Sequence, residues 1–311
     1  MSDVTVRALR QDDLERFLAL GDAGYGPPGR GFLATAAEGH YRPEWTWVAE
    51  REGRVVARAA WYGAPDDDHP IALDWFDVAP GPDRVAVGAL LLEIAHRRVR
   101  GADGALAEYH LFLPPDWRDR PDVRAAADDR MAAASDAGLR PFVERLRFEW
   151  LAASGVPAGS GRLSFAPIEP DRDDELLDLL ARINEGTLDA FTRRDLARSG
   201  PEAAAREQLD GMDWMPAPRG WWRLASLPGG ELVGLVMPSR NYQSPVIGYL
   251  GVVPEHRGRG YVGDLLAEGT AVLVAEGADR IVADTDTGNQ PMAAAFERAG
   301  YRVIGRRIVM T

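Results

Sequence analysis

The chain contains no cysteine among its 311 residues. This absence excludes a disulfide framework, a thiolate nucleophile and any cysteine-ligated zinc or iron–sulfur site. Histidine is also scarce, and no two copies have the i, i+4 spacing that would place them on one face of a helix. The histidines lie at positions 40, 69, 96, 110 and 256. We therefore predict a site without a metal ion.

Long apolar runs and an excess of positive charge are absent too. No apolar stretch approaches the roughly 20 residues needed to cross a bilayer, and the start, MSDVTVRALRQDD, lacks the apolar core of a signal peptide. With 36 basic against 48 acidic side chains, the formal charge is -12, which argues against nucleic acid or an anionic membrane as a partner. The sequence favours a cytoplasmic globular protein and leaves its oligomeric state open.

The expected elements follow the same order in two halves of the chain. Each half offers a short strand, acidic residues, an amphipathic helix, a hairpin, and a further strand that leads into a helix. The strands are expected at 4–9, 45–50, 55–61 and 71–78, and again at 163–168, 221–227, 232–237 and 246–253. This order predicts an internal duplication of one α/β unit. Residues 152–162, rich in Ser, Gly and Ala, are expected to link domains 1–152 and 163–311.

Two further segments are less regular. Residues 184–219 form a long, polar, helix-rich insertion, which is expected either to cover an active site or to be a surface connection. Residues 109–129 contain three prolines and many charges, and they are expected to extend the late strand region of the first half.

The segment 252–266 carries the clearest chemical signal. A strand is expected to end at Val253, and a helix to begin near Val262. Glycine at such a turn lets main-chain N–H groups approach a ligand closely, and a helix N-terminus favours negative charge. The turn contains Gly258, Gly260, Gly263, Arg257 and Arg259. The pattern predicts a phosphate or diphosphate site.

Two common nucleotide motifs fit this segment poorly. A Walker loop needs Lys-Ser/Thr after its last glycine, and no such pair occurs here. Gly258-x-Gly260-x-x-Gly263 has the spacing of a Rossmann fingerprint, but the interleaved arginines and the late position in the chain argue against it.

The residues Arg257-Gly258-Arg259-Gly260-Tyr261-Val262 resemble motif A of the GCN5-related N-acetyltransferase (GNAT) superfamily, Arg/Gln-x-x-Gly-x-Gly/Ala. The last position of the motif, Gly/Ala, is Val262 in this chain, and the next residue is Gly263. Downstream, residues 289–301 resemble the motif B helix, with Asn289, Gly300 and Tyr301 in register. The resemblance implies an α/β fold (α+β, with a mixed sheet) of two tandem GNAT-like domains. Each domain would have a mostly antiparallel central sheet flanked by helices.

The resemblance also implies an activity: transfer of an acetyl group from acetyl-CoA to the amine of a small molecule, by direct attack on the thioester. The implied cofactor-binding residues are Val252, Val253, Arg257, Gly258, Arg259, Gly260, Tyr261, Val262, Gly263 and Asn289. Val252 and Val253 would bind the pantetheine arm through their main chain. Two other classes stay open: a CoA-binding sensor without catalysis, and a protein or peptide N-acetyltransferase.

The match departs from the family at the residue that protonates the leaving thiolate, because Phe296 stands where motif B has tyrosine. Tyr249 and Tyr301 are the candidate catalytic substitutes, with packed core aromatics as the alternative. The general base is open, with Tyr249, Glu255, Asp284 and Asp286 as candidates. Asp189, Asp210 and Asp213 of the insertion are weaker candidates for selecting a cationic acceptor.

The first half lacks this signature. Asp83 stands where Arg257 would fall, and the paired glycines are missing. A carboxylate there would repel a diphosphate, so the first domain is predicted to be degenerate and not to bind CoA.

Overall fold

The chain divides into two compact units. A computed structural model describes residues 3–20, 31–101, 104–169, 172–241 and 243–311. Unit 1 comprises residues 1–145 and 305–311, and unit 2 comprises residues 146–304. The predicted domains, 1–152 and 163–311, put the division a few residues later and assign residues 305–311 to the second domain.

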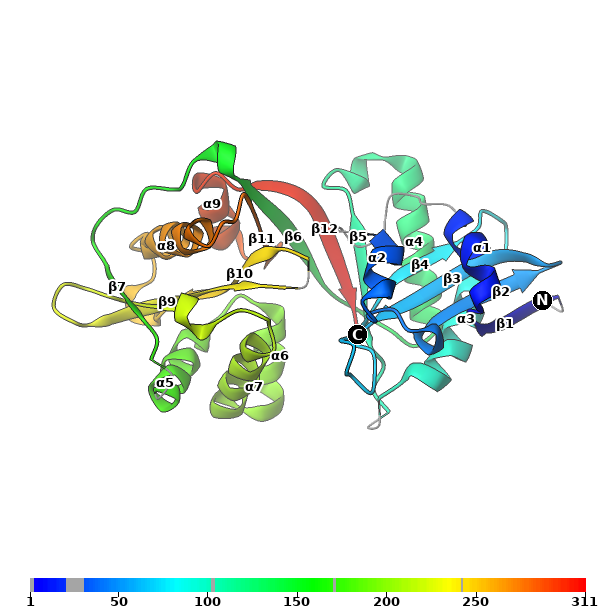
Figure 1. The fold of residues 1–311 in the computed structure, drawn as a ribbon, viewed down its shortest axis with the longest axis horizontal. Helices are drawn as coiled ribbons and strands as arrows, with labels where there is room; N and C mark the ends of the chain where they lie inside the picture. Colours follow the sequence, from blue (N-terminus) through cyan, green and yellow to red (C-terminus); the bar gives the residue numbers. More distant parts are fainter. Residues whose placement is uncertain (1–2, 21–30, 102–103, 170–171, 242) are drawn as a thin grey trace. The chain divides into compact units, whose positions relative to one another are not determined.

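Unit 1 is a sheet with helices on both faces (Figure 1). Its strands are β1 (Val4–Ala8), β2 (Thr46–Arg51), β3 (Arg54–Tyr62), β4 (Ala72–Val78) and β5 (Glu108–Leu113). Its α-helices are α1 (Leu14–Ala19), α2 (Gly31–Ala37), α3 (Arg84–Val99) and α4 (Pro121–Asp136). The strands follow one another in the sheet as in the sequence. Neighbours are antiparallel, except that β4 and β5 are parallel.

Unit 2 repeats this plan. Its strands are β7 (Ser164–Pro167), β8 (Arg223–Ser226), β9 (Leu232–Arg240), β10 (Pro245–Val252) and β11 (Arg280–Asp286). Its α-helices are α5 (Asp173–Asn184), α6 (Ala190–Ser199), α7 (Pro201–Asp213), α8 (Tyr261–Ala275) and α9 (Gln290–Arg298). The strand order again follows the sequence, and β10 and β11 form the parallel pair. The predicted mixed sheet flanked by helices is confirmed.

The same irregularity marks the fourth strand of each unit. The register with the preceding strand shifts around Asp74 in β4 and around Gly248 in β10. Each of these residues lies six positions before a proline that follows the strand, Pro80 or Pro254. A bulge leaves one residue outside the ladder and bends the strand. Its recurrence at the same place supports a duplication that the order of elements had predicted.

Each unit completes its sheet with part of a strand that begins in the other unit. Strand β6 (Pro141–Leu151) starts in unit 1 and ends in unit 2, whereas β12 (Arg302–Met310) starts in unit 2 and ends in unit 1. Trp150 of β6 packs in the core of unit 2, and Met310 of β12 packs in the core of unit 1. The two repeats therefore exchange their last strands, which the sequence did not predict.

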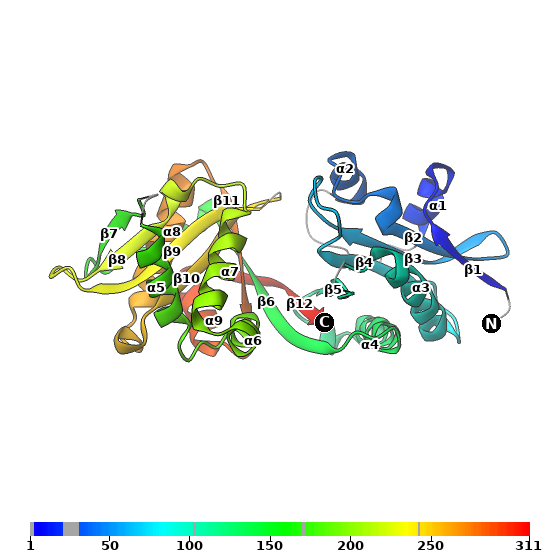
Figure 2. The same ribbon diagram turned by 90° about the horizontal axis from the view of Figure 1, so that it is seen from below.

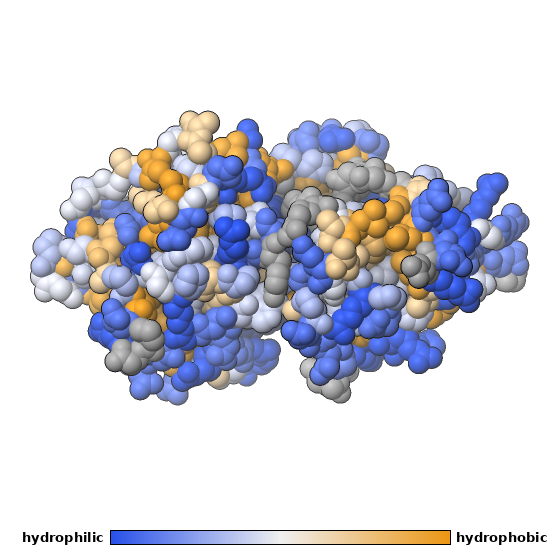
Figure 3. All heavy atoms as spheres, viewed as in Figure 1, coloured by the Kyte–Doolittle hydropathy of each residue, from blue (hydrophilic) through white to orange (hydrophobic). Residues whose placement is uncertain are grey.

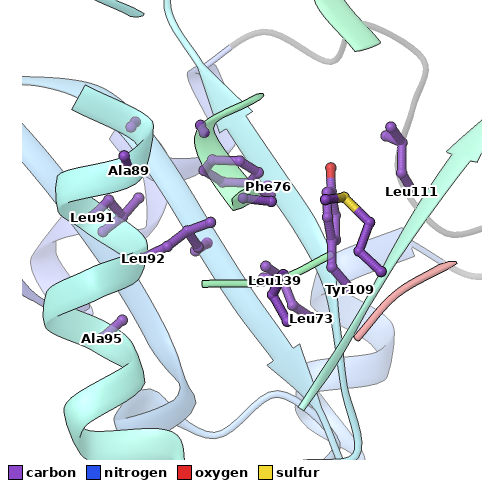
Figure 4. Close-up of a cluster of buried hydrophobic side chains, with 14 of the residues drawn as sticks. Leu73, Phe76, Ala89, Leu91, Leu92, Ala95, Tyr109, Leu111 and Leu139 are labelled. Atoms are coloured by element: carbon purple, nitrogen blue, oxygen red, sulfur yellow. The ribbon is translucent and has the colours of Figure 1, made fainter. Parts of the chain in front are cut away.

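In unit 1 the larger core lies between the sheet and helices α3 and α4. Figure 4 shows Leu91 and Leu92 of α3 beside Leu73 and Phe76 of β4, with Tyr109 of β5 nearby. A smaller cluster on the other face joins α1 and α2 to the sheet through Phe17 and Phe32. The α4 segment is a helix with Pro121 in its first turn, so the expectation of an extended strand region at 109–129 holds only for β5.

Successive residues of β9 face opposite helix layers, as a pleated strand requires. Val236 packs with α8, whereas Leu235 and Met237 pack with α5 and α7. Figures 1 and 2 show these helices against the two faces of the unit 2 sheet. In Figure 3 the outer surface over α5 to α7 is mainly hydrophilic, as expected for amphipathic helices. No helix in the described part of the chain is long and apolar enough to cross a membrane.

Candidate cofactor and acceptor site

The bulged strand β10 offers main-chain groups that the sheet does not use. Within the described residues its register with β11 consists of the pair Val246↔Val282, so the later residues of β10 diverge from β11. The Val253 N–H donates to the Val233 carbonyl (2.9 Å). Because hydrogen-bonded pairs alternate along an antiparallel ladder, Leu250 and Val252 direct their N–H groups away from β9. Val252 and Val253 were both predicted to bind the pantetheine arm through their main chain. The Val252 N–H is directed to the side where a ligand could bind. The Val253 N–H is already bonded to the Val233 carbonyl, and the Val253 side chain is buried.

The predicted glycine turn leads directly into α8. Gly258 and Gly260 have φ values of +76° and +81°, in the left-handed region that favours glycine. Gly260 is the N-cap of α8, and a Cβ added at Gly258 or Gly263 would meet no atom within 4 Å. The main chain is therefore open at the positive end of a helix dipole. Tyr261 and Val262 occupy the first turn, where Tyr261 is buried.

The Arg257 side chain points away from this opening. Its Nη1 and Nη2 donate to the carbonyls of Glu185 and Ile183, each at 2.7 Å, and its Nε donates to the Val252 carbonyl (3.1 Å). The guanidinium thereby satisfies carbonyls at the C-terminal end of α5, where a cation is also favoured by the helix dipole. Arg257 holds the turn in place by capping α5, a role that its sequence position does not reveal.

Part of the predicted linker lies across the first turn of α8. The Ser160 N–H donates to Asp264 Oδ1 (2.5 Å), and Arg162 Nη2 donates to Asp264 Oδ2 (3.0 Å). Arg162 Nη1 donates to the carbonyl of Arg259 (2.9 Å), and its guanidinium lies 4.7 Å from the centre of the Tyr261 ring. Sequence reasoning missed both Arg162 and Asp264. The acidic residue in the first turn of an expected helix was the available signal.

Helix α9 carries the motif B residues, but two of them are packed in the core. Asn289 is the N-cap, and its Oδ1 accepts from the Met292 N–H (3.3 Å). Phe296 stacks on Phe148 with ring centres 4.9 Å apart. The Tyr301 hydroxyl lies 2.7 Å from Thr270 Oγ1. Because the Thr270 hydroxyl donates to a carbonyl of its own helix, Tyr301 is the donor in this pair.

Tyr301 is therefore a core residue. It is 3% exposed, and burial raises its pKa. This is the packed-aromatic alternative that the sequence left open.

Tyr249 lies on the other face of the sheet, next to the bulge. Its hydroxyl donates to Asn184 Oδ1 (3.2 Å), and Asn184 Nδ2 donates to Gln208 Oε1 (2.9 Å). Burial raises the pKa of Tyr249 to about 12, and the negative charge of Asp189 acts in the same direction. The hydroxyl keeps its proton throughout the neutral range, and in this structure it donates that proton to Asn184 Oδ1. Asn184 and Gln208 carried no sequence signal, because each is one polar residue on an expected helix.

Five of the six candidate carboxylates have a structural partner. Asp286 is 3% exposed and accepts from the Ala190 N–H at the start of α6 (2.6 Å). Asp284 Oδ2 lies 3.5 Å from Arg147 Nη1. Asp189 is the N-cap of α6. The remaining pairs are Glu255 with Arg182, and Asp213 with Arg219, whereas Asp210 is exposed on α7. Within the described ranges, no three His, Asp or Glu side chains are grouped as metal ligands.

In unit 1 the space beside the equivalent strand is filled by an arginine. Counting back from Pro80 and Pro254, Phe76 corresponds to Leu250. The Phe76 carbonyl accepts from Arg130 Nε of α4 (2.8 Å), and Arg130 Nη2 lies 2.6 Å from an Asp77 carboxylate oxygen. Arg130 is 5% exposed. Asp83, the counterpart of the arginine in the turn, pairs with Arg51, which lowers the Asp83 pKa.

Known proteins resemble this chain in sequence over part of its length and in fold over almost all of it. The acetyltransferase (GNAT) family profile matches residues 188–301. Mycothiol acetyltransferase of Corynebacterium aurimucosum is 35% identical over 54 residues, which are 17% of this chain and 18% of that protein. This match therefore spans less than a fifth of the relative's length.

Two solved structures share the fold. The GCN5-related N-acetyltransferase from Sphaerobacter thermophilus has a TM-score of 0.64 at 16% identity, with 99% of this chain and 94% of that chain covered. A tandem GNAT protein from the clavulanic acid biosynthesis pathway has a TM-score of 0.53 at 19% identity, covering 99% and 98%. The profile match thus identifies a GNAT-family segment at residues 188–301, within unit 2, and the chain as a whole shares the fold of these solved structures.

Proposed function

We propose that unit 2 transfers an acetyl group from acetyl-CoA to the amine of a small molecule. The proposal rests chiefly on one observation: the side of β10 that diverges from β11 is followed, after a single 3-10 turn at Pro254–His256, by an open glycine turn at the N-terminus of α8. The diphosphate would bind the N–H groups of residues 258–262, since the Gly263 N–H donates to the Gly260 carbonyl (3.0 Å). The pantetheine arm would lie along Leu250 and Val252. Asn289 would contact the cofactor through the amide nitrogen that its capping bond leaves available.

In the chemical step the amine nitrogen attacks the thioester carbonyl carbon. A C–N bond forms, the carbonyl oxygen becomes an oxyanion, and the C–S bond then breaks to release the thiolate of CoA. A main-chain N–H of β10 would stabilise the oxyanion. At neutral pH the alkyl ammonium first gives one proton to solvent, because the amine must be neutral to attack. The nitrogen gives a second proton to solvent as the tetrahedral intermediate collapses to the neutral amide. No acyl-enzyme is required.

Tyr249 is proposed to assist the departing sulfur as a hydrogen-bond donor, by turning its hydroxyl from Asn184 Oδ1 to the thiolate. Its pKa is raised to about 12, whereas a thiol has a pKa of about 8.5. Full proton transfer to the thiolate would therefore be uphill by roughly 5 kcal/mol. A hydrogen bond to a charged acceptor needs no such transfer and contributes about 1.5–3 kcal/mol. Solvent then protonates the thiolate.

Unit 1 is proposed not to bind CoA. Arg130 and Asp77 occupy the side of β4 that corresponds to the pantetheine side of β10. To admit a ligand there, the chain would have to expose a buried ion pair, which is costly because each charge would lose its partner.

Turnover of acetyl-CoA with a panel of small amines tests the proposal. The full-length chain should release CoA thiol at a rate that depends on at least one amine and should form the matching amide, identified by mass spectrometry. Because Phe296 replaces the family tyrosine, a CoA-binding sensor is the second candidate. Saturable CoA binding without thiol release for any amine or peptide would favour the sensor. Acetylation confined to peptides would favour a protein acetyltransferase.

A further inference from the structure

The linker segment of residues 159–162 lies across the N-terminus of α8, outside the 188–301 family segment. Its contacts there join Ser160 and Arg162 to Asp264 and to the Arg259 carbonyl. Arg162 also donates from Nε to Ser160 Oγ (2.7 Å). A Cβ added at Gly260 would lie 3.6 Å from Arg162 Nη2. The guanidinium thus borders the glycine turn that precedes α8.

The contacts of Ser160 and Arg162 balance the negative charge of Asp264. Asp264 is 5% exposed and lies in the first turn of α8, where a carboxylate would repel an approaching diphosphate. The Ser160 N–H and Arg162 hold its two oxygens and neutralise its charge. A carboxylate in a helix first turn is favoured by the dipole, but at an anion site its charge has to be balanced.

Arg162 has donor capacity beyond these bonds. A guanidinium has five N–H groups, and the bonds to Ser160, Arg259 and Asp264 use one each on Nε, Nη1 and Nη2. One N–H therefore remains on each terminal nitrogen, and the side chain is 46% exposed. Arginine suits phosphate because its planar donors match pairs of phosphate oxygens.

We propose that Arg162 binds a phosphate group of coenzyme A, so that the segment between the two repeats forms part of the cofactor site. This inference rests on the proposed function. It adds a positioning residue that lies outside the matched family segment, and it assigns the linker a role in binding.

The test is calorimetric titration of the full-length chain with CoA, using Arg162→Gln, Asp264→Asn and the double variant. Arg162→Gln should weaken binding by about tenfold, which is the lower end for a charge-assisted hydrogen bond. If Arg162 contacts phosphate directly, the double variant should still bind CoA more weakly than Asp264→Asn alone. Recovery of wild-type affinity in the double variant would overturn the proposal, because Arg162 would then act only by neutralising Asp264.

Controls separate this proposal from its premise. Arg198→Gln removes an exposed positive charge from α6, where Arg198 pairs with Glu207, and should leave the affinity for CoA unchanged. Thermal unfolding of each variant shows whether the fold persists, and Arg162→Lys keeps the charge without the planar donors. If the parent binds CoA and Arg162→Gln binds it with the same affinity, the proposed role of Arg162 is refuted, but the proposed function is not. Absence of CoA binding by the parent would refute the proposed function itself.

Dephospho-CoA identifies which phosphate is bound. If the loss caused by Arg162→Gln is the same with dephospho-CoA, Arg162 binds the diphosphate. If the loss disappears, it binds the 3′-phosphate of the ribose.

Discussion

At the scale of single residues, the site depends on groups whose direction the sequence could not give. Motif spacing located the glycine turn, because left-handed glycines and a helix start have local sequence signals. The direction of Arg257 depends on where α5 ends, and the acceptor of the Tyr249 hydroxyl, Asn184, lies on α5. These contacts join residues that are distant in the sequence, so spacing alone could not predict them.

Tyr249→Phe should lower kcat by roughly 10- to 100-fold, which corresponds to one hydrogen bond to a charged sulfur. Tyr301→Phe is the matched control: it loses a core hydrogen bond to Thr270 and should lower stability with little change in kcat. Because the pKa of Tyr249 is raised to about 12, its donor proton is present below that pH. The pH profile of kcat should therefore show no decrease between pH 6 and about 10 that is present in the parent and missing in Tyr249→Phe. Equal kcat values for the two variants would contradict the assignment.

Substitution by alanine should change the free energy of unfolding in opposite directions at Gly251 and at Gly263. A Cβ at Gly251 would lie 2.2 Å from Ile183 Cγ2 of α5, so Gly251→Ala should lower the free energy of unfolding by about 1–3 kcal/mol. A Cβ at Gly263 meets open space within α8, and Gly263→Ala should raise it by up to about 1 kcal/mol through helix propensity. Urea unfolding of both variants measures the two changes. A tolerated Gly251→Ala would show that α5 does not pack closely on β10.

At the scale of elements, hydrophobic periodicity predicted most helices and strands of the repeated plan. Helix α5, for example, buries Leu176, Leu179, Leu180 and Ile183 after an acidic first turn. Helix α4 was missed because its prolines and aspartates suggested irregular structure, although Pro121 in a first turn is a start signal. Strands β6 and β12 were missed as well, because their sheet neighbours come from distant parts of the chain.

The cap on α5 makes Arg257 a structural residue first. Arg257→Gln removes three donors from main-chain carbonyls and should lower the free energy of unfolding by about 1–3 kcal/mol. Arg259→Gln, whose Nη1 lies 3.4 Å from His256 Nδ1, should cost less than half as much. Thermal unfolding of the two variants makes the comparison. Equal losses of stability would contradict the capping role.

At the scale of the whole molecule, the strand exchange makes the core of each unit depend on a strand that begins in the other unit. Residues 163–311 alone would lack β6, which supplies Phe148 and Trp150 to the core of unit 2. Each large apolar side chain contributes roughly 1.5–3 kcal/mol when buried, out of a total of about 5–15 kcal/mol. The fragment 163–311 should therefore be largely unfolded by circular dichroism, whereas residues 141–304 should fold. A stable, cooperative 163–311 fragment would contradict the importance of β6.

The central claim is that main-chain N–H groups at the start of α8 bind the diphosphate of coenzyme A. Calorimetric titration of the full-length chain with CoA tests it through Gly263→Glu and Gly263→Gln, two side chains of nearly equal size that both extend into open space. The account predicts that the glutamate variant binds CoA at least tenfold more weakly than the glutamine variant, and that salt narrows the gap because the repulsion is screened. Equal affinities at low salt, with both variants folded, would contradict it.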